Sequence, residues 1–380
     1  MDAPLLVEAA ERFGTPLYVT DLDRAAANLA AYGRALPNAL VAYALKANPD
    51  PQLLQRLVAE GAGAEVVNAT ELALARRAGC PPQRIVMNGI GRSDAELAEA
   101  LEAGILVNAE SLDDLQAILA NPACQGSPRI GLRLNPALDA ETHPHLATGG
   151  ASSKFGIAWD DLADAAARLA GRSLRLAAVG AHIGSDIADG SVHAELLERL
   201  HEAQQRTGAE RIDLGGGLRS IDALGAIATD EPLIVEPGRS IVADAGWLVT
   251  RVVRTQPRAD RTYLVADAGM TELIRPMLYG AQHPVRMLQP GTPLAARRVD
   301  LAGPVCEAGD VLAVDIGQWM TTSRAGVGAL LAIEAAGAYG ASMASNYNGR
   351  LRPAQAVIEA GEVRLSRRRE TLEDLVSRDI

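Results

Sequence analysis

Eight short apolar runs recur between residues 40 and 238, and most are followed by an amphipathic stretch rich in alanine and leucine. The runs cover residues 41–45, 64–67, 85–87, 105–107, 130–134, 176–183, 212–214 and 233–235. The helical patterns cover residues 51–60, 70–78, 93–103, 111–120 and 159–170. Strands that alternate with helices predict an α/β fold with a parallel sheet, and eight strands favour a closed (β/α)8 barrel. An open Rossmann-like sheet is the alternative, because periodicity does not detect closure.

The pattern changes beyond about residue 240 to strand-like runs separated by glycine, proline and aspartate. These runs cover residues 263–266, 285–288, 310–314, 329–333 and 356–358. They predict an all-β domain, which the strand-like residues 16–20 are expected to join. We therefore expect a barrel over residues 22–240 and a β domain made of residues 1–21 and 241–380. The tail from Ser366 is expected to be a solvated helix or a frayed end.

Composition excludes several classes of function. A net charge of -11 and an aromatic content of 3% argue against a nucleic-acid surface. The chain has no long apolar stretch and no secretory pattern at its start, so we expect a cytoplasmic protein with no membrane contact. Cys80, Cys124 and Cys306 lie far apart and no H-E-x-x-H occurs, so neither a disulfide framework nor a metal site is expected.

Lysine is almost absent from the chain. Of 36 basic residues only Lys46 and Lys154 are lysine, and the others are arginine. Arginine can replace lysine on a solvated surface, but its guanidinium cannot form an imine with an aldehyde. The two lysines are therefore candidates for chemistry, and composition alone does not choose between them.

Lys46 follows the first barrel strand, in the segment Tyr43-Ala-Leu-Lys46-Ala-Asn48. Active sites of such barrels lie at the carboxyl ends of the strands, so this lysine is expected at the chemical face. Partial desolvation there favours the neutral amine that imine formation requires. The alternative is a lysine on the barrel rim that forms an ion pair.

Two glycine-containing loops follow the last two barrel strands. Gly215-Gly216-Gly217 comes after the seventh, and Glu236-Pro237-Gly238-Arg239 comes after the eighth. Barrels often bind a phosphate at these loops, because glycine lets backbone N–H groups approach it closely. The sixth strand ends in His182-Ile-Gly-Ser185, which places a flat ring and a hydroxyl at the same face. A histidine in the core is the alternative for His182.

Together these segments resemble the fold-type III pyridoxal 5′-phosphate (PLP)-dependent decarboxylases, and within them the diaminopimelate decarboxylase branch. The motifs that carry the resemblance span residues 43–48, 153–156, 182–185, 215–217, 236–239, 267–270, 306–310 and 337–340. They occur in the order of the family. The resemblance implies PLP-dependent decarboxylation of meso-2,6-diaminopimelate to L-lysine.

The resemblance also implies a role for each motif residue. Lys46 would bind PLP as an imine, His182 would stack on the ring, and Glu236 would face the ring nitrogen. The phosphate would be held by Ser185, Gly216, Gly217, Gly238, Arg239 and Tyr339. The amino-acid substrate would contact Arg239, Arg275, Tyr279, Glu307 and Tyr339. Cys306 would supply the proton that replaces the carboxyl group. In family members Cys306 and Glu307 complete the site of the partner subunit, so a homodimer is expected.

Three features depart from the family pattern. Asp186 stands where glutamine is common, and Asn68-Ala-Thr70 replaces Ser-Gly-Gly. The segment between Gly217 and Glu236 is short, so the helix after the seventh strand is expected to be reduced or missing. Three alternatives stay open: a decarboxylase for another carboxylated diamine or basic amino acid, a PLP racemase, and a non-catalytic PLP-binding protein. Glu236 favours decarboxylation, because racemases of this fold place an arginine near the ring nitrogen.

Overall fold

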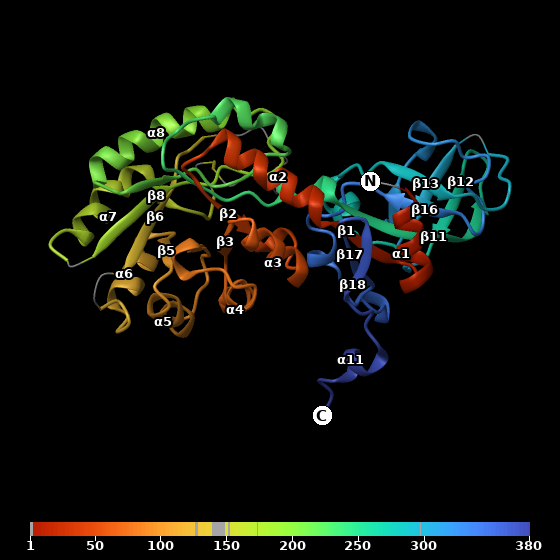
Figure 1. The fold of residues 1–380 in the computed structure, drawn as a ribbon, viewed down its shortest axis with the longest axis horizontal. Helices are drawn as coiled ribbons and strands as arrows, with labels where there is room; N and C mark the ends of the chain where they lie inside the picture. Colours follow the sequence, from red (N-terminus) through yellow and green to blue (C-terminus); the bar gives the residue numbers. More distant parts are fainter. Residues whose placement is uncertain (1–2, 126–127, 139–148, 151–152, 173, 297) are drawn as a thin grey trace. The chain divides into compact units, whose positions relative to one another are not determined.

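The chain folds into two compact units in the computed structural model (Figure 1). The structure describes residues 3–125, 128–138, 149–150, 153–172, 174–296 and 298–380. One unit comprises residues 26–241 and is called the barrel unit below. The other comprises residues 1–25 and 242–380 and is called the β unit.

The barrel unit contains a closed parallel sheet. Its strands are β2 (Leu40–Ala44), β3 (Gly63–Val66), β4 (Ile85–Met87), β5 (Leu106–Ala109), β6 (Arg129–Asn135), β8 (Arg175–Gly180), β9 (Arg211–Asp213) and β10 (Ile234–Val235). Neighbours pair in the order β5-β4-β3-β2-β10-β9-β8-β6, and β5 pairs with β6 to close the ring. A two-residue strand, β7 (Ile157–Ala158), pairs in parallel with the end of β6. The expected barrel is confirmed, and the open-sheet alternative is wrong.

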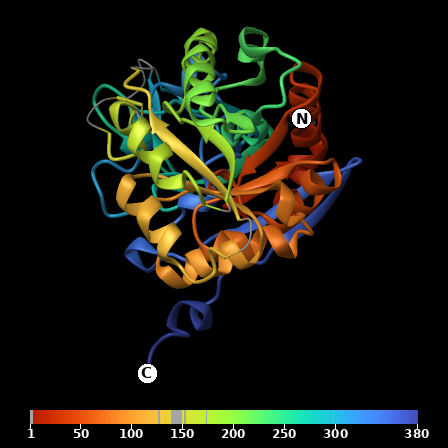
Figure 2. The same cartoon turned by 90° about the vertical axis from the view of Figure 1, so that its left-hand side faces the viewer.

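Helices lie outside the barrel strands (Figure 2). They are α2 (Leu22–Ala35), whose first turn belongs to the β unit, α3 (Pro51–Ala59), α4 (Ala69–Arg77), α5 (Asp94–Glu102), α6 (Leu112–Ala120), α7 (Leu162–Leu169) and α8 (Ser191–Thr207). Side chains cap several of their first turns: Asp50 accepts from the backbone of α3, and Ser93 forms a capping box with Glu96. These caps satisfy N–H groups that a helix leaves unpaired.

The connection between β9 and β10 contains no α-helix. It forms only a 3₁₀ helix, η4 (Ile221–Ile227), which Ser220 caps. The reduced helix expected after the seventh strand is therefore confirmed. Leu224 and Ile227 are buried, so this short segment still covers part of the barrel.

The β unit is built on a second sheet. Its strands are β1 (Leu17–Asp21), β11 (Gly246–Pro257), β12 (Thr262–Ala266), β13 (Val285–Gln289), β14 (Val299–Ala302), β15 (Val311–Ala313), β16 (Leu330–Ile333), β17 (Ala354–Glu359) and β18 (Glu362–Arg367). The main order is β15-β14-β12-β11-β1-β17-β18, and β16 joins β13 to β11. β1 pairs with both β11 and β17, as expected for residues 16–20.

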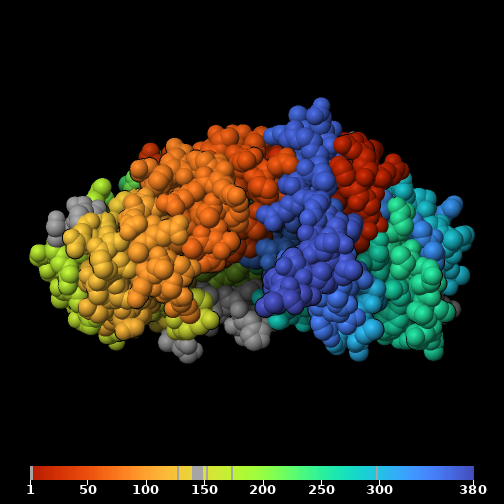
Figure 3. Space-filling view, turned by 90° about the horizontal axis from the view of Figure 1, so that it is seen from below, coloured from red at the N-terminus to blue at the C-terminus, as the bar shows by residue number. Residues whose placement is uncertain are grey.

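Several elements of the β unit were missed by the sequence patterns. Strands β11, β14 and β18 were not predicted, and neither was α1 (Ala3–Phe13), which packs Leu6, Ala9 and Ala10 against the sheet. The tail contains the last part of β18 and then the exposed helix α11 (Leu372–Val376). In the space-filling view this segment, coloured dark blue, lies on the surface of the β unit (Figure 3). No helix within the described part of the chain is long and apolar enough to cross a bilayer.

Candidate active site

Lys46 lies directly after β2, in a 3₁₀ turn formed by Leu45–Ala47. Its Nζ is 2.6 Å from Oε2 of Glu65 on β3. The lysine side chain is 38% exposed whereas the glutamate side chain is fully buried, so the amine faces the opening of the barrel. Lys46 therefore lies at the expected end of the first barrel strand, and Glu65 is the carboxylate that pairs with it.

Asn88 connects Glu65 to Glu236 inside the barrel. Its side-chain N–H groups donate to Oε1 of Glu65 at 3.1 Å and to Oε1 of Glu236 at 2.7 Å. Asn88 directly follows β4 and Glu236 directly follows β10, so closure of the barrel brings them together. All three residues are buried. A continuous chain of polar contacts therefore runs from Lys46 to Glu236.

Asp213, the last residue of β9, is a second buried acid whose charge acts on Glu236. Its carboxyl group accepts from Gly215 N–H at 3.0 Å and from the side chain of Asn108 at 3.4 Å. Burial raises the pKa of Glu236, and the neighbouring charges of Asp213 and Glu65 raise it further. Burial raises the pKa of Asp213 in the same way. The two buried acids thus favour retention of a proton.

His182 follows β8 and is held in a defined orientation. The backbone N–H of Gly216 donates to its Nδ1 at 3.1 Å, which requires a lone pair on that nitrogen. Surrounding protein atoms, and then the charges of Arg133 and Lys46, lower the pKa of His182. The ring is therefore neutral at physiological pH. His193 Nε2 lies 2.9 Å from the carbonyl oxygen of Gly216 and holds the same loop.

The glycine loops approach one another too closely for side chains. A Cβ at Gly216 would lie 2.2 Å from the carbonyl oxygen of Glu236, and one at Gly217 would lie 2.3 Å from that of Gly184. Gly217 also has a φ of 107°, which side-chain-bearing residues rarely adopt. The loops that follow β8, β9 and β10 are therefore packed together, as the phosphate-site interpretation requires.

Ser185 and Arg239 meet beside these loops. Arg239 Nη2 donates to Ser185 Oγ at 3.0 Å. Asp186, with a φ of 71°, places its Oδ1 3.8 Å from Arg239 Nε and 2.9 Å from Arg219 Nε. The carboxylate of Asp186 is thus shared between an exposed arginine and the arginine of the predicted site. Asn68, another departure from the family, caps α4 by accepting from Glu71 N–H.

These residues of the barrel unit fit PLP. They offer an amine that faces the barrel opening, a neutral imidazole, a buried carboxyl group suited to a ring nitrogen, and a glycine cradle with an arginine and a hydroxyl for a phosphate. All come from the carboxyl ends of strands, where barrels of this kind perform chemistry.

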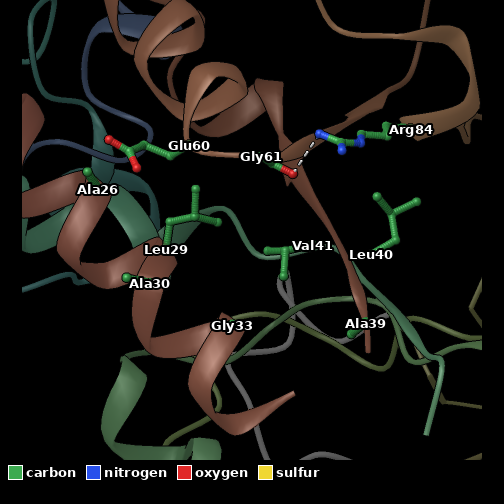
Figure 4. Close-up of a pocket in the computed structure, with 10 residues that line it drawn as sticks. All are labelled: Ala26, Leu29, Ala30, Gly33, Ala39, Leu40, Val41, Glu60, Gly61 and Arg84. Carbon is green, nitrogen blue, oxygen red and sulfur yellow. Dashed lines mark hydrogen bonds between the residues drawn. The ribbon is translucent and has the colours of Figure 1, made fainter. Parts of the chain in front are cut away.

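A separate hollow lies at the amino ends of the strands (Figure 4). It is lined by Ala26, Leu29, Ala30, Gly33, Ala39, Leu40, Val41, Glu60, Gly61 and Arg84. Arg84 Nη1 donates to the carbonyl oxygen of Gly61 at 3.3 Å across one side of it. Leu40 and Val41 begin β2, whereas Lys46 follows its end, so this hollow is distinct from the candidate site.

The remaining predicted site residues belong to the β unit. Arg275 begins α10 (Arg275–Tyr279) and is buried, with its guanidinium carbon 5.4 Å from the ring centre of Tyr279 and 5.6 Å from that of Tyr339. Tyr339 has a left-handed φ of 58°. The structure therefore brings together three residues that were predicted separately to contact the substrate.

Cys306 and Glu307 lie in the turn between β14 and β15. Asp310 holds this turn: its Oδ2 accepts from Val305 N–H at 2.8 Å and its Oδ1 from Met270 N–H at 2.7 Å. Cys306 is exposed. The hydroxyl of Tyr347 donates to Glu307, and this hydrogen bond raises the pKa of Tyr347. The thiol is thus presented at the surface of the β unit on an ordered turn.

The chain is similar to several known proteins. Residues 22–243 match the family model described as "Pyridoxal-dependent decarboxylase, pyridoxal binding domain". The chain is 40% identical to a diaminopimelate decarboxylase of Deinococcus radiodurans, over 99% of this chain and 98% of that protein. It is 38% identical to one of Aquifex aeolicus, over 98% of this chain and 93% of that protein.

The chain belongs to the diaminopimelate decarboxylase family of pyridoxal-dependent decarboxylases. A solved diaminopimelate decarboxylase of Helicobacter pylori, complexed with L-lysine, superposes with a TM-score of 0.89 at 32% identity and covers 98% of each chain. The resemblance and the fold class inferred from the sequence are both confirmed. PLP is the cofactor of this family, and the residues at the strand ends of the barrel fit it.

Three buried residues of this family member were missed by the sequence interpretation. Glu65, Asn88 and Asp213 lie in or directly after apolar runs that were taken only as core strands. The sequence did contain an indication of the two acids, because charged residues are almost never fully buried without a partner. An acid inside an apolar barrel strand therefore indicates a polar partner in the interior.

Proposed function

We propose that this enzyme decarboxylates meso-2,6-diaminopimelate to L-lysine, with PLP bound to Lys46. The observation that carries the proposal is the polar chain from Lys46 through Glu65 and Asn88 to Glu236. It joins an amine that can bind an aldehyde to a buried carboxyl group suited to a ring nitrogen. The full-length similarity to diaminopimelate decarboxylases supports the choice of substrate.

Bound PLP supplies an electron sink for the electron pair that remains when carbon dioxide leaves. Glu236 would face the ring nitrogen and hold a proton there, which would strengthen that sink. The neutral ring of His182 would stack on one face of the cofactor and exclude water from it. Ser185, Gly216, Gly217, Gly238, Arg239 and Tyr339 would bind the phosphate, as the resemblance implies.

The substrate-binding residues are those that the resemblance to the family implies: Arg239, Arg275, Tyr279, Glu307 and Tyr339. Arg275 and Arg239 bind the distal carboxylate by charge-assisted hydrogen bonds. Tyr279 and Tyr339 line the same region, and Glu307 binds the distal ammonium. Cys306 delivers the proton to the carbon that loses carbon dioxide. Its exposure supports a role at the site of a partner subunit, and the proposed active form is a homodimer.

An assay of carbon dioxide release tests the substrate. The enzyme loaded with PLP is expected to release carbon dioxide from meso-diaminopimelate and to show little turnover of ornithine, lysine or arginine. Ornithine and lysine lack the distal carboxylate that the two arginines bind. Turnover of one of those three amino acids without turnover of meso-diaminopimelate would contradict the proposal.

The two lysines provide a matched pair of variants for the cofactor. Lys46→Arg is expected to abolish the absorbance band of bound PLP and the activity, because a guanidinium forms no imine. Lys154→Arg is expected to retain both, since Lys154 Nζ contacts the ring of Phe155 at 5.2 Å and a guanidinium can do the same. Borohydride reduction followed by peptide mapping should label Lys46. A label on Lys154 would overturn the assignment.

A further inference from the structure

His193 is a buried histidine in the first turn of α8, and the mechanism proposed above does not use it. It is 1% exposed, and its Nε2 lies 2.9 Å from the carbonyl oxygen of Gly216. A carbonyl oxygen only accepts hydrogen bonds, so Nε2 carries the hydrogen and donates it. Burial lowers the pKa of His193, so the ring is neutral and its Nδ1 carries no hydrogen.

Nδ1 of His193 is an unpaired polar atom in the interior. It is buried and has no hydrogen-bond partner among the described residues. An unpaired polar atom destabilises a folded protein, whereas a phenylalanine ring would fill the same space without one. Packing alone therefore does not account for a histidine here, and the hydrogen bond from Nε2 to Gly216 is what distinguishes it.

Five of the six backbone N–H and C=O groups in the loop 215–217 form hydrogen bonds with described residues. The partners are Asp213 Oδ1 and Glu236 N–H for Gly215, His182 Nδ1 and His193 Nε2 for Gly216, and Ile187 N–H for Gly217. The N–H of Gly217 is the one group left over within the described part of the chain. It is therefore the donor that this loop can offer to an anion.

His193 sets the direction of that donor, because the C=O of Gly216 and the N–H of Gly217 belong to one peptide group. A trans peptide group is planar, and its C=O and N–H point in opposite directions. Since the oxygen points at His193 on α8, the hydrogen points away from α8. A Cβ at Gly217 would lie 2.3 Å from the carbonyl oxygen of Gly184, so Gly217 lies next to the loop that carries Ser185.

Glycine on both sides of this peptide group would otherwise allow it to rotate, because no Cβ opposes the rotation. A rotated peptide would present its oxygen in place of the N–H, and that oxygen would repel a phosphate. We propose that His193 is a positioning residue that holds the carbonyl of Gly216 and thereby keeps the N–H of Gly217 directed at the cofactor phosphate. This role rests on the proposed function, in which the loop binds the phosphate of PLP.

Pyridoxal is a suitable probe beside PLP, because the two differ in the phosphate alone. Titration of the PLP-free enzyme with each gives the ratio of their dissociation constants. His193→Phe keeps a ring but removes the donor, so it is expected to weaken PLP binding about tenfold and to leave pyridoxal binding unchanged. His193→Gln should retain the affinity for PLP, because its side-chain nitrogen can donate from nearly the same place. A histidine that only packs α8 would affect both ligands alike.

His201→Phe is the matched control, since His201 lies on the same helix and its Nε2 contacts Glu231 at 2.7 Å. It should leave the ratio of dissociation constants unchanged. An unchanged ratio in His193→Phe, or no rescue by His193→Gln, would overturn the role of His193 without contradicting the proposed function. An unmodified enzyme that binds PLP no more tightly than pyridoxal would overturn both the proposed phosphate site and the role of His193.

Nuclear magnetic resonance of enzyme labelled in histidine and glycine nitrogen tests the same role without a variant, in case His193→Phe does not fold. The ring of His193 should carry its hydrogen on Nε2. The amide proton of Gly217 should shift downfield and exchange more slowly with solvent when PLP is bound, because it then donates to a charged acceptor. A hydrogen on Nδ1 of His193, or an amide of Gly217 that does not respond to PLP, would overturn the proposal.

Discussion

The amine of Lys46 lies 2.6 Å from the carboxylate of Glu65, and only the lysine side of this ion pair reaches solvent. A buried carboxylate stabilises the ammonium form of its partner, whereas imine formation needs the neutral amine. Glu65→Gln is therefore expected to lower the pH of half-maximal PLP capture by about one unit. Stopped-flow absorbance measured across a pH series gives this value. The exposed carboxylate change Glu99→Gln should leave it unmoved, and no shift in Glu65→Gln would contradict the prediction.

The stability of the PLP-free enzyme should depend on the Asp213–Glu236 pair. Burial raises the pKa of both acids above their values in the unfolded chain, so the folded state binds more protons. Their contribution to the free energy of unfolding is fully present below about pH 4. It is lost as the pH rises through the folded pKa values, by about 1.4 kcal/mol per pH unit for each additional proton that the folded state binds.

Urea unfolding of the PLP-free enzyme at several pH values measures this loss. The free energy of unfolding should decline less steeply with increasing pH in Asp213→Asn and in Glu236→Gln than in the unmodified enzyme. An unchanged slope in both variants would show that the pair does not retain a proton in the fold.

Asp186 should weaken the binding of dicarboxylate substrates. Its carboxylate lies 3.8 Å from Arg239 Nε and competes there with the distal carboxylate of the substrate. Asp186→Asn is expected to lower KM for meso-diaminopimelate about two- to fivefold with kcat unchanged, because partly exposed ion pairs contribute at most about 1 kcal/mol. Arg219→Gln removes the other partner of Asp186 and should raise KM. Changes of KM in the same direction in both variants would contradict this prediction.

A shared active site can be tested by mixing inactive subunits. Lys46→Ala and Cys306→Ala homodimers should each be nearly inactive, the first without bound PLP and the second without its proton donor. If each site takes its thiol from the partner subunit, a mixed dimer contains one intact site. An equal mixture after subunit exchange should then recover about a quarter of the unmodified activity. No recovery, with exchange verified by mass spectrometry, would place the thiol and the lysine of one site in the same subunit.

The local pattern of the sequence was enough to predict the barrel. Short apolar runs with helical stretches between them specify strands and helices through hydrogen bonding and burial over a few residues. All eight runs became strands of the closed sheet, and Lys46 lies at the predicted end of the first one. The glycine loops could also be predicted from the sequence, because glycine is the residue that permits two backbone segments to approach closely.

The β unit was predicted less completely for a physical reason. β11 is a long strand whose burial changes along its length, and β18 is mostly exposed, so neither shows a regular alternation. The position of β11 depends on pairing with β1, which is distant in sequence. Such pairing is a property of the assembled sheet and leaves a weak local signal.

The sequence by itself determined the strand order along the chain, the lysine that can bind an aldehyde and the loops that can hold a phosphate. Only the tertiary structure decided which groups surround that lysine. Glu65, Asn88, Asp213 and Glu236 come from four strands and meet because the sheet closes into a ring. Contact between side chains so far apart in sequence follows from closure, which no local periodicity encodes. Burial inside that ring then raises the pKa of Asp213 and Glu236.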